Sequence, residues 1–356
     1  MADSRQFDVI KAMRFPLICL VVFAHSLGFQ RADISASFDG WNVYHFVSEM
    51  ISHNFAKIAV CWFFVFSGYL FFRNMEGTFT WDSCLTKWKK RLRSLVLPYI
   101  IWNAIFVLAI IVKSGLFTAI GLGPDEQMTW VRKWDVVYWF LTGPVNFPLW
   151  YMRDLVLMSL LAPAWYCFFK YGKGYSLAIL IAVYASGWDP SIPGMRAIIF
   201  FGLGAYLGIF KVDILELCRK IKVPSYILAP VLLLLTTYFN TTDAHEYLLR
   251  AFYPFGMVAF MNICDRLCMK EKNKDVLFRL SKAVFFIYGS HEIFILGWTK
   301  GLFLRIFGNS LAGTVISYFC VPVVVLLVCL ALYKLFEKIT PRTLSFVCGG
   351  RVSRAK

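Results

Sequence analysis

The feature that most constrains this fold is a succession of ten apolar segments, with the polar residues gathered in the connections between them. A helix needs about 20 predominantly apolar residues to cross the roughly 30 Å hydrocarbon core of a bilayer, with some latitude for tilt or thinning. Hydrophobic residues make up 59 % of the chain and the mean hydropathy is +0.63, which excludes an ordinary soluble domain. We expect spans at residues 9–29, 55–72, 94–113, 148–169, 175–188, 194–210, 224–239, 247–264, 281–300 and 311–334.

The basic residues are divided unequally between alternate connections. With the N-terminus placed in the cytoplasm, the connections on that side, together with Lys282 at the start of the ninth span, carry 24 Lys and Arg residues and those on the other side carry 4. Because cytoplasmic loops are enriched in Lys and Arg, this ratio supports both the orientation and the number of spans. The sequence therefore predicts an all-α, multi-pass membrane protein of about ten transmembrane helices with both termini cytoplasmic. It predicts one membrane-embedded domain at residues 1–340 and a short basic tail at 341–356, and the net charge of +16 reflects topology rather than nucleic-acid binding.

The first span carries two polar residues that lipid does not require, Arg14 and His25. They are eleven positions apart, so they project from one helix face and are separated by about 16 Å along the axis. Such groups are costly inside a membrane unless they face a protein interior or a wet cavity, which favours a functional site. The alternatives are that Arg14 reaches the lipid headgroups and that His25 hydrogen-bonds a neighbouring helix. Pro16 adds a local weakness, because it removes one helix hydrogen bond.

A dense cluster of cations precedes the third span, where Lys90, Arg91 and Arg93 follow Lys87 and Lys89. Guanidinium groups bind phosphates in a bidentate manner, so this cluster is a candidate phosphate site. An anchor on anionic lipid explains the cluster equally well.

Three other spans contain candidate site residues. In the second span, the pair Ser67-Gly68 permits close approach of either another helix or a slender ligand. In the fourth, Arg153 and Asp154 either line an outward-facing pocket or extend their side chains to the membrane interface. In the ninth, His291 beside Glu292 lies near mid-membrane, where a site role and helix–helix hydrogen bonding are equally good explanations.

The connection before the fourth span contains an aromatic run at residues 130–140. Such a run is typical of an amphipathic helix at the membrane interface, and a carbohydrate-stacking surface is the alternative.

Taken together, these segments resemble the acyltransferase family 3 membrane proteins over residues 6–336. The matching residues are Asp8, Arg14 and His25 in the first span, Phe63 to Leu70 with Ser67-Gly68 in the second, the basic cluster followed by Pro98-Tyr99, Leu149-Trp150-Tyr151 in the fourth and Ile287-Tyr288 with His291 in the ninth. One departure is that the family's pair of arginines with two residues between them is Lys90 and Arg93 in this chain.

The resemblance implies transfer of an acyl group from acyl-CoA, most often acetyl-CoA, to a hydroxyl of a carbohydrate or lipid-linked glycan in the bacterial cytoplasmic (inner) membrane. His25 would act as general base, since its unperturbed pKa of about 6.5 suits proton transfer at neutral pH, or would carry the acyl group itself. Arg14 would be the second catalytic residue and, with Lys90, Arg91 and Arg93, would bind the phosphates of coenzyme A. Ser67 and Gly68 would also belong to the binding site of this donor. Trp150, Arg153, Asp154, His291 and Glu292 would contact the acceptor.

Two readings from other classes compete with this one. The charged face of the first span could line the pathway of an exporter or flippase of a glycan, or the chain could be a non-catalytic subunit of a polysaccharide machine. Besides acyl-CoA and the acceptor, we expect contact with membrane lipid, no nucleic acid and no metal. The sequence leaves self-association into a homo-oligomer open.

Overall fold

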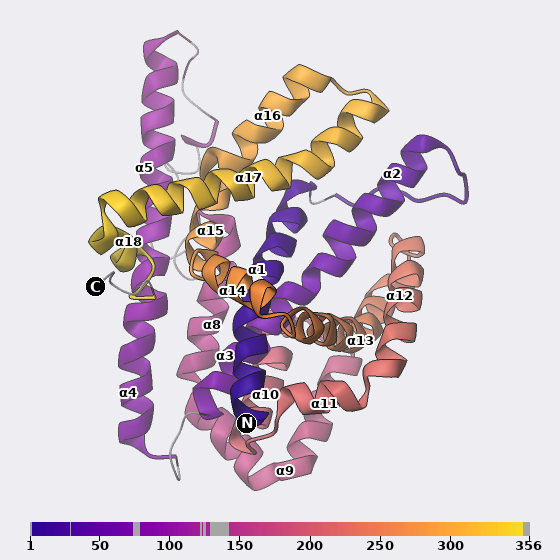
Figure 1. Ribbon diagram of the computed structural model, residues 1–356, viewed down its shortest axis with the longest axis vertical. Coiled ribbons are helices and arrows are strands. Elements are labelled where there is room, and N and C mark those ends of the chain that lie inside the picture. The colour runs from indigo at the N-terminus through magenta and orange to yellow at the C-terminus, as the bar shows by residue number, and fades with distance from the viewer. Residues whose placement is uncertain are drawn as a thin grey trace.

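The computed structural model describes residues 2–28, 30–73, 79–121, 123, 126–128 and 142–351, and within these ranges it contains helices and no strand (Figure 1). The predicted all-α class is thereby confirmed. The elements are α1 (Ala2–Ser26), α2 (Gly40–Ser48), η1 (Glu49–Asn54), η2 (Phe55–Lys57), α3 (Ile58–Arg73), α4 (Trp81–Arg91), η3 (Leu92–Val96), α5 (Leu97–Ala119), η4 (Phe147–Leu149), α8 (Trp150–Leu160), α9 (Ala162–Ala185), α10 (Met195–Ile209), α11 (Ile214–Lys220), α12 (Lys222–Tyr238), α13 (Ala244–Leu267), α14 (Glu271–Ser281), α15 (Val284–Ser290), η5 (His291–Ile295), α16 (Leu296–Phe307), α17 (Leu311–Ile339) and α18 (Pro341–Val347).

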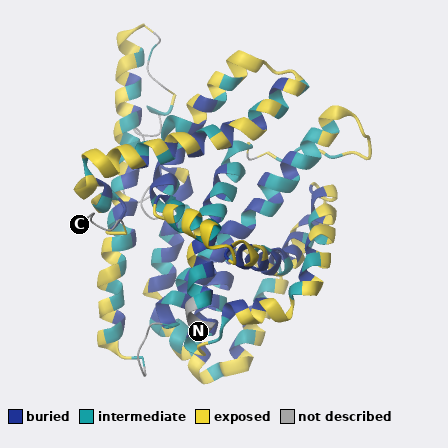
Figure 2. Ribbon diagram, in the orientation of Figure 1, coloured by how far each residue is buried: buried dark blue, intermediate teal, exposed yellow. Residues whose placement is uncertain are grey.

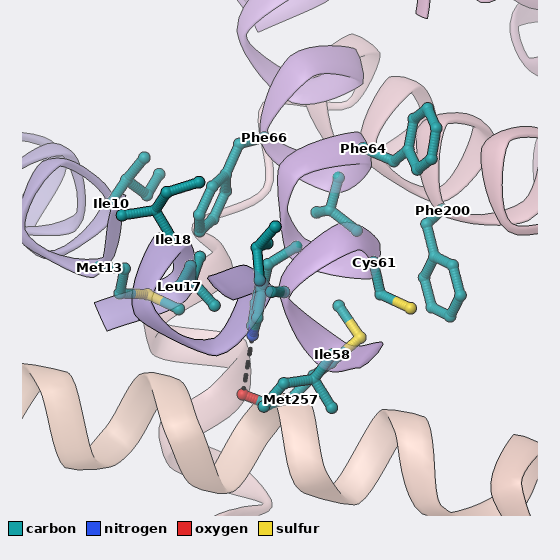
Figure 3. Close-up of a cluster of buried hydrophobic side chains, with 14 of the residues drawn as sticks. Ile10, Met13, Leu17, Ile18, Ile58, Cys61, Phe64, Phe66, Phe200 and Met257 are labelled. Atoms are coloured by element: carbon teal, nitrogen blue, oxygen red, sulfur yellow. Dashed lines mark hydrogen bonds between the residues drawn. The ribbon is translucent and has the colours of Figure 1, made fainter. Parts of the chain in front are cut away.

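Helix α1 runs through the middle of the bundle and contacts α3, α13, α14, α15 and α17 (Figure 1). It continues through Pro16 without a break, so Arg14 and His25 do lie on one helix. One side of α1 is buried in the core, where Met13 and Leu17 are fully buried beside side chains of α3 and α13 (Figure 3). The cluster is fixed by one polar contact, in which Trp62 Nε1 donates to the Met257 carbonyl at 3.1 Å.

The closest helix pair is α3 with α10, which meet through glycines. A Cβ on Gly68 would collide with the Phe201 carbonyl and lie 2.9 Å from Ala205 N. A Cβ on Gly204 would in turn collide with the Val65 carbonyl. Small residues allow this backbone-to-backbone approach in membrane helices, so the structure assigns the close approach at Gly68 to helix packing rather than to open space for a ligand.

The number of membrane spans remains a prediction. Four stretches of the described residues are long and apolar enough to cross a bilayer: Gly40–Arg73, Trp81–Ala119, Ala244–Leu267 and Leu311–Ile339. The total rises to six if two bent pairs each count as one span, α8 with α9 at 59° and α10 with α11 at 107°. The predicted ten spans and the orientation of the termini are not confirmed. Large apolar side chains cover the outer faces of α5 and α17, including Leu108, Leu116 and Leu327 (Figure 2).

The aromatic run and the basic tail predicted from the sequence differ in how far the structure describes them. The aromatic run at 130–140 lies outside the described residues. The first part of the predicted basic tail is helix α18, which packs on α5 with Leu344 only 1 % exposed. Trp102 Nε1 of α5 donates to the Val347 carbonyl at 3.1 Å, so this segment is docked on the helical domain.

Candidate active site

His25 in the last turn of α1 meets Glu292 in η5, and this pair is the centre of the candidate site. His25 Nδ1 lies 3.4 Å from Glu292 Oε1, with the two side chains 14 % and 27 % exposed. Both residues are therefore shielded from bulk solvent but still accessible. A carboxylate beside Nδ1 favours the proton on that nitrogen, which leaves the Nε2 lone pair of His25 available as a base.

The helix that carries Glu292 is broken immediately after it. Ile293 has φ −73° and ψ 79°, and Phe294 has a positive φ of 60°, which is a strained conformation for a residue with a bulky side chain. The break separates α15 from α16 and is flanked by π-helical geometry, which is frequent at functional sites. It allows the polar residues at 291 and 292 to face α1 while α16 continues in a new direction.

His291 is the second imidazole of the site, with its ring centroid 5.3 Å from that of His25. Its Nδ1 lies 3.0 Å from the carbonyl oxygens of Ile287 and Tyr288. Because both partners only accept, Nδ1 must carry the proton and Nε2 presents a lone pair. That Nε2 is buried and has no hydrogen-bond partner among the residues that the structure describes. An unsatisfied buried acceptor is costly, so it marks a position where a donor from a ligand is expected.

Lys300 was not predicted as a site residue, although it is the last residue of the ninth predicted span. Its Nζ donates to the His25 carbonyl at 3.0 Å, and it interacts electrostatically with Glu292. The signal available in the sequence was a cation eight positions after Glu292 in an apolar segment.

At the other end of the site, cations gather around Tyr151 of α8. The Tyr151 hydroxyl lies within electrostatic range of the guanidinium groups of Arg91, Arg351 and Arg14. Arg91 Nη2 also donates to the Ser67 carbonyl at 3.2 Å. The side chain of Arg14 remains exposed. Arg14 of α1 and Arg91 of the predicted basic cluster therefore lie in the same neighbourhood.

The members of the basic cluster differ in their placement. Arg91 is the one beside Tyr151, whereas Lys90 and Arg93 are exposed, with Arg93 close to Gly350. Ser67 Oγ is buried and has no hydrogen-bond partner within the described part of the chain.

The residues predicted in the fourth span make contacts with α3, with the start of α10 and with each other. Arg153 Nε donates to Asp154 Oδ1 at 2.8 Å, and Asp154 Oδ2 accepts from Gly194 N at 3.0 Å. Asp154 is fully buried, so its carboxylate stabilises the backbone that enters α10. The ring of Trp150 lies 6.5 Å from that of Phe64. Each of the three residues has a partner within the helical bundle, and their predicted contact with the acceptor stays a prediction.

A cavity of about 240 Å³ opens beside the His25 end of α1. Its lining is mixed, with aromatic rings, hydroxyl groups and one cation. The lining residues are Ser26, Tyr44, Lys300, Leu304, Gly308, Asn309, Thr314, Ser317, Tyr318 and Val321. The sequence does not predict this cavity, because its lining comes from α1, α2, α16 and α17, which are far apart in the chain, and no motif marks these residues.

The comparisons with known proteins give a family and one relative. A family model described as an acyltransferase domain matches residues 7–334. The chain is 25 % identical to the succinoglycan biosynthesis protein ExoH of Rhizobium meliloti (strain 1021) over 360 aligned residues, which cover 98 % of this chain and 94 % of that protein. No solved structure matches.

Proposed function

We propose that this chain, which belongs to the acyltransferase domain family, moves an acyl group from acyl-CoA to a carbohydrate hydroxyl at the membrane. Acetyl-CoA is the first donor to test. A relative named for succinoglycan biosynthesis supports a glycan as the acceptor. The single observation that carries the proposal is the His25–Glu292 pair. His25 lies on the same helix as Arg14, and Lys300, which lines the cavity, donates to the His25 carbonyl.

The proposed chemistry follows from the state of His25. Glu292 holds the proton on Nδ1, so Nε2 accepts the proton of the acceptor hydroxyl as its oxygen attacks the thioester carbonyl. The carbon–sulfur bond then breaks, and the leaving thiolate takes the proton from Nε2 to give coenzyme A and the new ester. The carboxylate of Glu292 stabilises the imidazolium between these two proton transfers. An acyl-imidazole on His25 is the alternative route.

The donor side is supported by the geometry of α1. Because α1 is a single helix, Arg14 and His25 are separated by about 16 Å, a distance that a pantetheine arm spans. The pyrophosphate of coenzyme A would then lie at Arg14 and Arg91, where no carboxylate forms an ion pair with either guanidinium in the described ranges. Ser67 Oγ is buried beside the Arg91 contact and has no hydrogen-bond partner among the described residues, so a polar atom of the bound acyl-CoA would satisfy it.

The acceptor would approach from the opposite side, through the cavity at the end of α1. Ser26 follows His25 directly and lines this cavity together with Lys300. Hydroxyl and ammonium groups are suited to a polyhydroxylated ligand, because they donate and accept hydrogen bonds at several positions. Entry from two sides keeps donor and acceptor apart until both reach the imidazole.

The test is transfer of a labelled acetyl group from acetyl-CoA to glycan by the purified full-length protein. We expect His25→Ala to abolish labelled product and His45→Ala, which removes a histidine of α2, to retain it. Wild-type amounts of product from His25→Ala would refute the catalytic assignment. Glycan export without any acyl transfer would favour the exporter instead, and denaturing mass spectrometry for an acetylated His25 separates the two chemical routes.

A further inference from the structure

The segment after α18 turns back towards the arginine-lined end of the site. We propose that Arg351 is a third guanidinium of the donor site and binds the same phosphate groups as Arg14 and Arg91. This inference rests on the proposed function and adds a binding residue to it. Arg351 lies beyond residues 7–334, the range matched by the family model, so the family resemblance does not supply this role.

The path of the chain to this position is fixed by packing. Helix α18 buries Leu344 and is followed by Cys348, each only 1 % exposed. Trp102 Nε1 donates to the Val347 carbonyl. Two backbone hydrogen bonds then close the turn, from Gly349 N to Phe346 O at 3.0 Å and from Gly350 N to Ser345 O at 2.8 Å. The position of Arg351 is thus set by a docked helix and a closed turn.

The turn itself requires glycine at two successive positions. Gly349 and Gly350 have φ values of +64° and +76°, in the left-handed region that side chains disfavour. A Cβ on Gly349 would also lie 2.9 Å from Ser94 Cα and from Pro98 Cγ, so the turn is pressed against the start of α5. The next residue along the chain is Arg351, and its direction depends on this close contact.

The Arg351 side chain is then held in place by two contacts. Its Nη1 donates to the Cys348 carbonyl at 3.0 Å, and its guanidinium carbon lies 4.0 Å from the centroid of the Phe285 ring. A guanidinium stacked on an aromatic face keeps its remaining N–H groups free to bind an anion. The side chain is still exposed to solvent, so an anion can reach it.

The surroundings of Arg351 are cationic. It lies within electrostatic range of Arg91 and Arg14, and all three guanidinium groups lie within that range of the Tyr151 hydroxyl. Ring contacts connect the same places, because Phe285, on which Arg351 stacks, lies 6.1 Å from Tyr288, and Tyr288 lies 6.1 Å from Tyr151, measured between centroids. Desolvation by the surrounding protein, together with the charge of Arg91, lowers the pKa of Arg351 to about 10. No carboxylate forms an ion pair with it among the residues described. Three like charges without a counterion are unfavourable, and a shared pyrophosphate relieves that repulsion.

The experiment measures the affinity of the full-length protein for coenzyme A at two salt concentrations. We expect Arg351→Ala to weaken binding about tenfold and to reduce the salt dependence, because one phosphate contact is lost. The coenzyme A affinity of Arg351→Lys should lie between those of the wild type and Arg351→Ala, since lysine keeps the charge but lacks the planar guanidinium group. Arg342→Ala is the matched control, because it removes an exposed cation from α18 of the same segment. The KM for acceptor should stay unchanged in all three variants.

A second variant tests the path of the chain without removing any charge. Gly349→Ala should displace the turn from Ser94 and Pro98 and weaken coenzyme A binding as Arg351→Ala does. If Arg14→Ala and Arg91→Ala weaken binding but Arg351→Ala and Gly349→Ala leave it unchanged, the inference is overturned and the proposed function stands. If none of the four changes coenzyme A affinity, the proposed donor site itself is wrong.

Discussion

Glu292 Oε1 lies 3.4 Å from His25 Nδ1, although the two residues come from the first and the ninth predicted spans. The pairing places a carboxylate beside Nδ1 of the imidazole, and in the proposed reaction Nε2 is the nitrogen that meets the substrate. His291 adds a lone pair 5.3 Å away, measured between ring centroids. Two imidazoles and one carboxylate are thus held together by α1 and by the break in the α15–α16 helix, the arrangement that the proposed base chemistry requires.

The first prediction concerns the charge of Glu292. Glu292→Gln keeps the shape of the side chain but removes the negative charge that holds the proton on His25 Nδ1. Loss of the orienting carboxylate in comparable triads costs up to about 10⁴ in kcat, and we expect a fall of at least about 10² in this enzyme. Steady-state kinetics should show the fall in kcat, while coenzyme A affinity stays within twofold. An unchanged kcat would mean that Glu292 does not act on His25.

The second prediction separates the members of the basic cluster. Arg91 interacts with Tyr151 and with the Ser67 carbonyl, whereas Lys90 is exposed on α4. Arg91→Ala should therefore weaken coenzyme A binding about tenfold or more, and Lys90→Ala less than threefold at physiological salt. Calorimetric titration of the purified variants measures both values. Equal losses would indicate a diffuse electrostatic attraction rather than a defined phosphate contact.

The third prediction concerns the acceptor cavity. Thr314→Val and Ser317→Ala remove hydroxyls from its lining without a large change in volume. Each lost hydrogen bond to an uncharged ligand costs about 0.5–1.5 kcal/mol, so the acceptor KM should rise about two- to tenfold. Coenzyme A affinity should not change. Thr343→Val on α18 is the control, and a rise in donor rather than acceptor KM would contradict the assignment of the cavity.

The helical class, the family and the placement of two polar residues on one helix can be predicted from the sequence alone. The apolar segments predict the all-α class and the motifs predict the family, and both are confirmed. The positions of Arg14 and His25 on one helix follow from the 3.6-residue period. These are local or family-wide properties, which a single sequence contains.

The remaining features depend on tertiary contacts. The helix breaks at Ile293 and Phe294, where neither glycine nor proline is present to signal it, so the approach of Glu292 to His25 could not be predicted. Arg351 belongs to a segment predicted only as a basic tail. Arg153 and Asp154 have the composition of a site but serve the entry to α10, because a buried carboxylate satisfies backbone N–H groups as readily as it binds a ligand.

The fourth prediction tests the packing that carries the arginine end of the site. A Cβ on Gly204 of α10 would collide with the Val65 carbonyl and lie 2.9 Å from Tyr69 N, both on the backbone of α3. Because neither backbone can give way locally, Gly204→Ala must separate the two helices, at a cost of about 1–3 kcal/mol. Thermal unfolding in detergent should show a lower midpoint for this variant.

The control for this prediction is Gly115→Ala in α5, where a Cβ would have no neighbour within 4 Å. Replacing glycine by alanine in an open helical position is neutral or stabilising by about 0.5–1 kcal/mol, so the two variants should shift the midpoint in opposite directions or by clearly different amounts.

Gly204→Ala also has an expected effect on ligand binding, because separation of α3 from α10 would move the Ser67 carbonyl that accepts from Arg91. Gly204→Ala should therefore weaken coenzyme A binding as well, and a variant that lost stability but bound coenzyme A normally would show that the Arg91 contact does not depend on this helix pair.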